Sequence, residues 1–191
     1  TLAVLIGGIE RIGRVTQVVV PVMAAVYVLG ALIILFANLD QIPGAFGLIF
    51  SNAFNGQAAA GGSLGVVIQR GIARGVCSNE AGLGTAPIAQ AAAKPGDPVL
   101  QGSVAMIGTF IDTIVICSMT ALVIIISGLY SQADYVSGAK NVSLTINAFG
   151  TALPGFDWIV VFGTVFFTLT TILGWGYYSE KCLEFLAGVK A

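Results

Sequence analysis

The sequence contains no histidine and very little charge. Of its 191 residues, 8 are lysine or arginine and 9 are aspartate or glutamate, so charged residues make up 9%, against about 25% in soluble domains. Without histidine the chain cannot form a Ser-His-Asp triad, a Cys-His pair or a histidine-ligated metal site. Its few, balanced basic residues leave no patch that could bind nucleic acid.

Cysteine is also scarce. Cys77, Cys117 and Cys182 are far apart and form no C-x-x-C motif, so neither a redox pair nor a thiolate metal site is predicted. With no nucleophile-base pair and no metal cluster in view, we predict that the chain is not an enzyme and holds no cofactor. Hydrophobic residues reach 57% of the chain, and the mean hydropathy is +0.95. This composition predicts an all-α, polytopic membrane protein.

Three segments are long and apolar enough to span a bilayer, whose core of about 30 Å needs roughly 20 residues of helix. We predict spans over residues 15–38, 104–127 and 157–179. The chain begins with Thr1 instead of methionine and carries no signal-peptide pattern. We therefore expect a fragment of a larger membrane protein, within a single transmembrane domain.

The stretch between the first two spans must also cross the membrane. Basic residues before the first span, before the second and after the third indicate one cytoplasmic side for all three places, and this requires an inward crossing between Asp40 and Lys94. That stretch is rich in glycine and carries arginines and Glu80, so it is too polar for a plain span. We predict a broken helix over 62–93, with half-helices over 70–77 and from about Pro87, and an unwound piece at 78–85.

Two further segments are expected outside the bilayer. Residues 42–54 are apolar but too short to span, and are predicted to form an amphipathic helix on the exterior surface. Residues 128–155 are predicted to be an exterior loop, with a short helix near 144–149.

A broken helix offers a binding site. The end of the first half exposes carbonyls, which attract a cation or an amine, and the start of the second exposes N–H groups, which attract an anion. The alternative is that these glycines only permit close packing, as Gly71-x-x-x-Gly75 would. Glu80, just before Gly82 and Gly84, favours unwinding because an acidic residue at bilayer depth is costly and usually functional.

The other two spans carry polar residues at helical spacing. Thr164, Thr168, Thr171 and Trp175 share one face of the third span, beside Thr170. Their hydroxyl oxygens suit a hard monovalent cation. The alternative is that the threonines bond to their own helix and the tryptophan anchors at the interface.

Asp112 is the acidic residue of the second span. It is a candidate cation or proton site. A buried partner for Arg70 or Arg74, or a place near the interface, is an equally good explanation.

Four ordered motifs carry a family resemblance. Residues 75–89, GVCSNEAGLGTAPIA, resemble the signature of the alanine or glycine:cation symporter family. Residues 7–12, 110–113 and 173–180, which read GGIERI, FIDT and LGWGYYSE, agree with it. The resemblance covers nearly the whole chain.

The resemblance implies a LeuT-like fold of two inverted repeats, with this chain as about helices five to eight and 62–93 as the broken helix. The missing helices of the same parent chain would supply the rest of the site. The implied activity is sodium-coupled symport of small neutral amino acids, alanine or glycine, by alternating access. The implied place is the lipid bilayer of a prokaryotic plasma membrane. Sodium would be a co-transported ligand.

The resemblance also implies site residues. Substrate contacts carry over onto Cys77, Ser78, Asn79, Ala81, Gly82, Thr171 and Trp175. Sodium would bind Thr170, Thr171 and the backbone carbonyl of Phe167, and Glu80 and Asp112 are candidates for coupling. Cys77 departs from the family pattern, which has an aromatic residue there. Two rival functions stay open: a proton-coupled amino acid transporter, and a membrane protein that binds an amino acid without transporting it.

Overall fold

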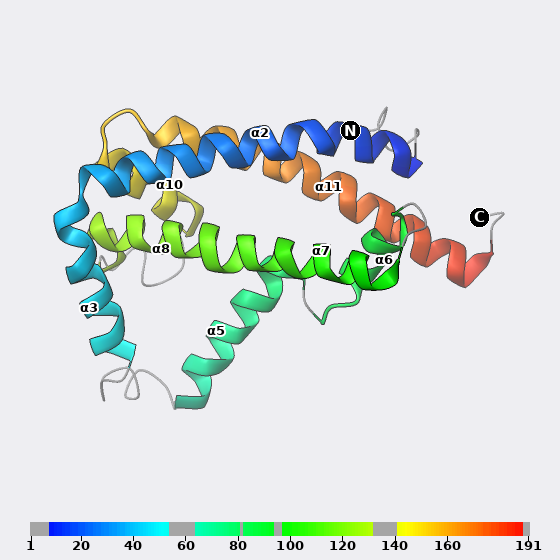
Figure 1. Cartoon of the computed structure of the whole chain (residues 1–191), viewed down its shortest axis with the longest axis horizontal. Coiled ribbons are helices and arrows are strands. Elements are labelled where there is room, and N and C mark those ends of the chain that lie inside the picture. Colours follow the sequence, from blue (N-terminus) through cyan, green and yellow to red (C-terminus); the bar gives the residue numbers. More distant parts are fainter. Residues whose placement is uncertain (1–7, 54–63, 81, 94–96, 132–140, 189–191) are drawn as a thin grey trace.

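The described part of the chain is helical throughout its regular structure (Figure 1). The computed structural model describes residues 8–53, 64–80, 82–93, 97–131 and 141–188. The α-helices are α2 (Gly8–Ala37), α3 (Ile42–Ala53), α5 (Leu64–Asn79), α6 (Thr85–Ala91), α7 (Pro98–Phe110), α8 (Cys117–Ile126), α10 (Asn141–Ala152) and α11 (Asp157–Ala187). Leu39–Gln41 (η1) and Leu129–Ser131 (η3) form short 3-10 helices, and Ile111–Ile116 (η2) forms a π-helix. The predicted all-α class is confirmed.

Three stretches within the described residues are long and apolar enough to cross a membrane. They are Ile12–Ala37, Pro98–Ile126 and Asp157–Ala187. The second runs through α7, η2 and α8 as one continuous helix. Together with the all-α architecture, this confirms the prediction of a polytopic membrane protein.

Helices α2 and α11 lie side by side along much of their length (Figure 1). A glycine lets them approach. A Cβ atom on Gly30 would lie 2.7 Å from the Cδ1 atom and 3.3 Å from the Cγ2 atom of Ile159, so a larger residue at this position would force the isoleucine side chain to shift. Small residues at such crossings let membrane helices pack closely. Close packing matters there because the hydrophobic effect contributes little to helix association in lipid.

The main core lies at the end of the bundle where α2, α3, α8, α10 and α11 meet. Ile34, Val123 and Phe149 are fully buried there. The hydroxyl of Tyr27 on α2 lies 2.6 Å from the Oγ1 atom of Thr120 on α8, which adds a polar link between these helices. A smaller buried cluster near the other end joins α2 and α11.

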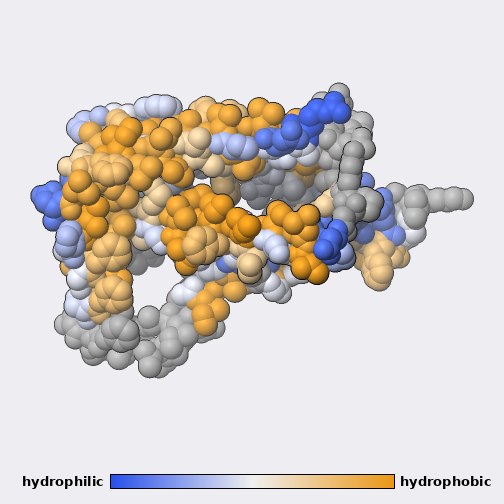
Figure 2. All heavy atoms as spheres, in the orientation of Figure 1, coloured by the Kyte–Doolittle hydropathy of each residue, from blue (hydrophilic) through white to orange (hydrophobic). Residues whose placement is uncertain are grey.

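Much of the surface is apolar. In Figure 2 hydrophobic residues cover most of the long helices, and hydrophilic residues gather near their ends. Large side chains such as Phe36, Met106 and Val165 are 66%, 69% and 61% exposed. Apolar surface on this scale needs a cover of lipid or further protein.

The break in the predicted broken helix over 62–93 differs in detail from the prediction. Helix α5 continues through Asn79, so Ser78 and Asn79 are helical and were wrongly assigned to the unwound piece. The interruption runs from Glu80 to Gly84, and α6 begins at Thr85 instead of near Pro87. Residues 62, 63 and 81 of the predicted segment lie outside the described residues.

Three other boundaries also differ from the predicted ones. Helix α7 begins at Pro98, earlier than 104, because the Asp97 side chain caps it by accepting a hydrogen bond of 2.9 Å from the Val99 amide. Helix α11 continues past 179 to Ala187, and a Lys181–Glu184 pair of 2.7 Å lies in this extension. The predicted exterior loop over 128–155 contains α10, which is longer than the short helix expected there.

Candidate functional site

A polar cavity lies where α5 ends and α6 begins. Its volume is ≈ 390 Å³, and its walls come from α2, the end of α5, the interruption, α6 and α11. The residues that line it and that carry the sequence prediction are Ser78, Asn79, Glu80, Phe167, Thr170, Thr171 and Trp175. The structure thus brings the broken helix and the threonine face of α11 to one place.

Glu80 begins the interruption with a left-handed backbone. Its φ is 56°, and Gly82 and Gly84 follow with 81° and 85°. A residue with a Cβ atom rarely adopts this region, at a cost of about 1–2 kcal/mol, whereas glycine enters it freely. The Leu83 amide bonds back to the Glu80 carbonyl at 3.2 Å, which closes a turn. The helix therefore stops at Asn79 because the next residues turn left-handed.

The carboxylate of Glu80 links the interruption to the two helices beside it, α6 and α11. Its Oε2 atom accepts hydrogen bonds from the hydroxyl of Thr85 at 2.8 Å and from the hydroxyl of Tyr178 at 3.4 Å. Thr85 is the first residue of α6, and Tyr178 lies on α11. Glu80 therefore lines the cavity with its Oε2 atom already engaged by two hydroxyl donors.

The last two residues of α5 bond to the π-helix η2. The Ser78 hydroxyl donates to Oδ2 of Asp112 at 2.7 Å, and the Asn79 amide nitrogen donates to Oγ1 of Thr113 at 3.1 Å. Asp112 itself does not line the cavity. Its described partner is a serine hydroxyl. The side chains of the arginines proposed as alternative partners lie outside the described residues.

The threonines of α11 all donate to carbonyls of their own helix. Thr171 Oγ1 lies 2.7 Å from the Phe167 carbonyl, and Thr170 Oγ1 lies 3.0 Å from the same oxygen. Thr164 and Thr168 make the same kind of bond, at 2.8 Å each. These hydrogen bonds within the helix therefore do not distinguish the threonines of a binding site from the others. What separates Thr170 and Thr171 from Thr168 is that both line the polar cavity.

A hydroxyl that donates to a carbonyl still has lone pairs to offer. Serine and threonine oxygens accept through two lone pairs and donate through one hydrogen. The Thr170 and Thr171 oxygens can therefore face a cation while their hydrogens point to the helix. The Phe167 carbonyl already accepts from both, so an ion bound there would share that oxygen with two hydroxyls.

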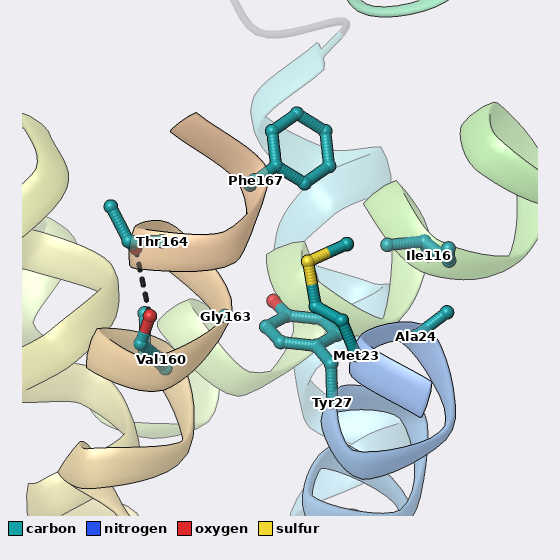
Figure 3. Close-up of a pocket in the computed structure, with 8 residues that line it drawn as sticks. All are labelled: Met23, Ala24, Tyr27, Ile116, Val160, Gly163, Thr164 and Phe167. Atoms are coloured by element: carbon teal, nitrogen blue, oxygen red, sulfur yellow. Dashed lines mark hydrogen bonds between the residues drawn. The ribbon is translucent and has the colours of Figure 1, made fainter. Parts of the chain in front are cut away.

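A second, apolar cavity adjoins the polar one (Figure 3). Its volume is ≈ 170 Å³, and Met23 and Phe167 line both cavities. In Figure 3 the Met23 side chain reaches across the cavity between Tyr27 and Phe167. These two side chains form a wall that the cavities share.

Some predicted residues lie away from the polar cavity. Cys77 and Gly82 do not line it, and Ala81 lies outside the described residues. Sequence reasoning missed the other residues that line it, namely Val20, Met23, Ala86, Ala89, Gln90, Gly174 and Tyr178. Tyr178 belongs to the LGWGYYSE motif and could have been found from it. Met23 carries no signal beyond its place in an apolar span.

The helices and this cavity define the class of protein: a polytopic membrane protein with a polar cavity inside its helical bundle. The model of the sodium:alanine symporter family matches residues 1–191. The chain therefore belongs to the sodium:alanine symporter family, whose members are transporters and not enzymes.

Curated relatives agree with this membership. The chain is 50% identical over 190 residues to the sodium/alanine symporter AgcS of Methanococcus maripaludis. The matched region covers 100% of this chain and 42% of that relative. It is 36% identical to the amino-acid carrier protein AlsT of Bacillus subtilis, over 97% of this chain and 39% of that protein. It is 34% identical to the sodium/proton-dependent alanine carrier protein of Bacillus sp. (strain PS3), over 94% and 43%. The chain thus spans about two-fifths of the length of the curated relatives it matches.

Proposed function

We propose that the whole protein carrying this chain is a sodium-coupled symporter of small neutral amino acids, alanine or glycine, that works by alternating access. The observation that carries the proposal is the polar cavity. It joins the end of a broken helix to the Thr170 and Thr171 oxygens inside a bundle of membrane-length helices. Family membership and the name of the AgcS relative support sodium and alanine as the transported pair.

The chemistry of the cavity supports a zwitterion together with a cation. The carbonyl end of α5 has negative character and suits an ammonium group. The carboxyl end of the substrate would need donors or the coupled cation, because α6 has only seven residues and its dipole adds little. Around this end of α5 we assign substrate contacts to Ser78 and Asn79, which line the cavity. For Cys77, Ala81 and Gly82 a substrate contact is supported by the family resemblance alone.

On α11 we assign substrate contacts to Thr171 and Trp175, and sodium ligation to Thr170, Thr171 and the Phe167 carbonyl. Trp175 is 56% exposed in this chain and lines the cavity. Its indole would close over a small side chain and so limit the size of the substrate. The remaining helices of a LeuT-like inverted repeat would supply the other wall and further sodium ligands.

The membrane setting is part of the same proposal. Three apolar helices fit a multi-pass protein in a lipid bilayer. The relatives come from an archaeon and from bacteria, which supports a prokaryotic plasma membrane.

Uptake of labelled alanine into liposomes carrying the full-length protein tests the proposal, with and without an inward sodium gradient. Accumulation of alanine only in the presence of the sodium gradient supports the proposal, because coupling requires sodium and alanine to favour the same conformational state together. Accumulation that is indifferent to sodium refutes sodium coupling. Binding of alanine without accumulation would favour the non-transporting alternative. Competition by glycine decides whether glycine shares the site.

Proton coupling is a second candidate, favoured by Glu80. Its carboxylate lines the cavity, and one relative is named a sodium/proton-dependent carrier. Uptake driven by an inward pH gradient in sodium-free buffer would establish this candidate. Loss of that uptake in Glu80→Gln would assign the proton to Glu80, and loss in Asp112→Asn would point to Asp112.

A further inference from the structure

The π-helix η2 interrupts the second membrane helix at the place where α5 ends. Figure 1 shows the end of α5 meeting the long helix of α7 and α8 near its middle. Single π turns inside α-helices are rare, and they are frequently found at functional sites. This turn, Ile111–Ile116, contains Asp112 and Thr113, which accept hydrogen bonds from α5; the Ser78 hydroxyl also lies 3.7 Å from the Sγ atom of Cys117, at the start of α8.

The two bonds join residues inside the cavity to residues outside it. Ser78 and Asn79 line the polar cavity, whereas Asp112 and Thr113 do not. The Ser78 hydroxyl donates to Asp112 at 2.7 Å, and the Asn79 amide donates to Thr113 at 3.1 Å. Among the described elements α5 packs chiefly against η2. The end of α5 is therefore held mainly by this one turn of helix.

The π turn explains how neighbouring residues can both reach α5. Adjacent positions in an α-helix point about 100° apart, so two of them rarely bond to the same partner helix. A wider turn brings adjacent positions closer in direction. Asp112 and Thr113 are adjacent, and both accept hydrogen bonds from the last turn of α5.

Resting on the proposed function, we infer that Asp112 and Thr113 are positioning residues, which hold the carbonyl end of α5 against the π turn and thereby orient the Ser78–Glu80 wall of the substrate site. This role needs an acceptor oxygen at each position. It does not need a charge that titrates or moves with the ion. Asp112 therefore acts on substrate binding through Ser78.

Alanine uptake by the full-length protein in liposomes tests this role at a fixed sodium gradient, with the apparent KM and Vmax measured for each variant. Asp112→Ala is expected to raise KM at least about tenfold, because it removes a hydrogen bond to a charged acceptor. Thr113→Val should raise KM about threefold to tenfold. Asp112→Asn and Thr113→Ser keep an acceptor oxygen, so each should stay within about threefold of wild type.

Thr109→Val is the matched control. Thr109 lies on α7 ahead of the π turn, and its hydroxyl bonds only locally among the described contacts, to the Ala105 carbonyl at 3.1 Å. Its KM should be unchanged. A merely structural role would lower Vmax, through less folded protein, and leave KM alone.

Two results would overturn the inference: an unchanged KM in both Asp112→Ala and Thr113→Val, or an Asp112→Asn variant as impaired as Asp112→Ala. Failure of the proposed function is distinguishable, because wild-type protein would then not accumulate alanine with sodium. In that case amide hydrogen exchange tests the positioning role without transport. Exchange over residues 80–84 should rise in Asp112→Ala and Thr113→Val and not in Asp112→Asn, and equal exchange in all of them would refute the positioning role.

Discussion

Replacing Thr171 by valine tests whether α11 holds the coupled ion. Valine keeps the shape of the side chain and removes its oxygen. The cost to folding is small, because Thr171 is exposed and its hydroxyl only bonds to the Phe167 carbonyl, which keeps the hydroxyl of Thr170. A surface change of this kind alters the free energy of unfolding by about 0.5 kcal/mol or less.

The expected effect on the ion is much larger. A hydrogen bond or ligand contact to a charged group contributes about 1.5–3 kcal/mol, and every 1.4 kcal/mol changes an equilibrium constant about tenfold. The sodium concentration for half-maximal alanine uptake should therefore rise about tenfold to 150-fold in Thr171→Val. Thr170→Val should shift it in the same direction, since both oxygens line the cavity.

Thr168→Val is the matched control. Thr168 makes the same kind of bond to its own helix, at 2.8 Å to the Thr164 carbonyl, but does not line the polar cavity. A sodium titration of uptake, corrected for the amount of protein in the liposomes, should leave this variant unchanged. Equal shifts in Thr168→Val and Thr171→Val, or none in either threonine of the cavity, would refute the ion site on α11.

The other predictions concern selectivity, packing and coupling. Trp175→Ala should let larger neutral amino acids such as leucine compete with alanine, measured as inhibition of labelled uptake; unchanged selectivity would remove the indole from the site. Gly30→Leu should lower stability by about 1–3 kcal/mol, because its Cβ would press on Ile159, and thermal unfolding in detergent should show this while Gly163→Ala, with nothing within 4 Å, shows little. Glu80→Gln should abolish uptake driven by a pH gradient and spare sodium-driven uptake if Glu80 carries a proton.

Much of the fold follows from where charge is absent. The three membrane-length helices were predicted from uncharged windows, and the structure has one long helix over each of them. The ends of the helices were less predictable. Lys181 and Glu184 lie within α11 and pair with one another, so a rule that ends a span at the first charge stops too early. Asp97-Pro98 is a helix-start signal that the predicted boundary at 104 did not take into account.

The site was predictable in part. Glu80 followed by two glycines marked the interruption, and helical spacing put the threonines and Trp175 on α11. The π turn could not be predicted, because one extra residue per turn leaves almost no trace in an apolar run. The Ser78–Asp112 bond joins residues that are 34 positions apart, and only the three-dimensional packing of α5 on η2 brings them together.

The wall between the two cavities gives the bundle room to adjust. Protein interiors are usually packed as densely as organic crystals, so a side chain that moves must push its neighbours. Met23 and Phe167 have open space on both sides, in the polar cavity and in the apolar one. A bulkier guest could therefore displace them into the apolar space without distorting the close contact between α2 and α11. The apolar cavity is then an expansion volume, and filling it with a larger side chain at Gly163 would stiffen the polar cavity without touching any of its polar groups.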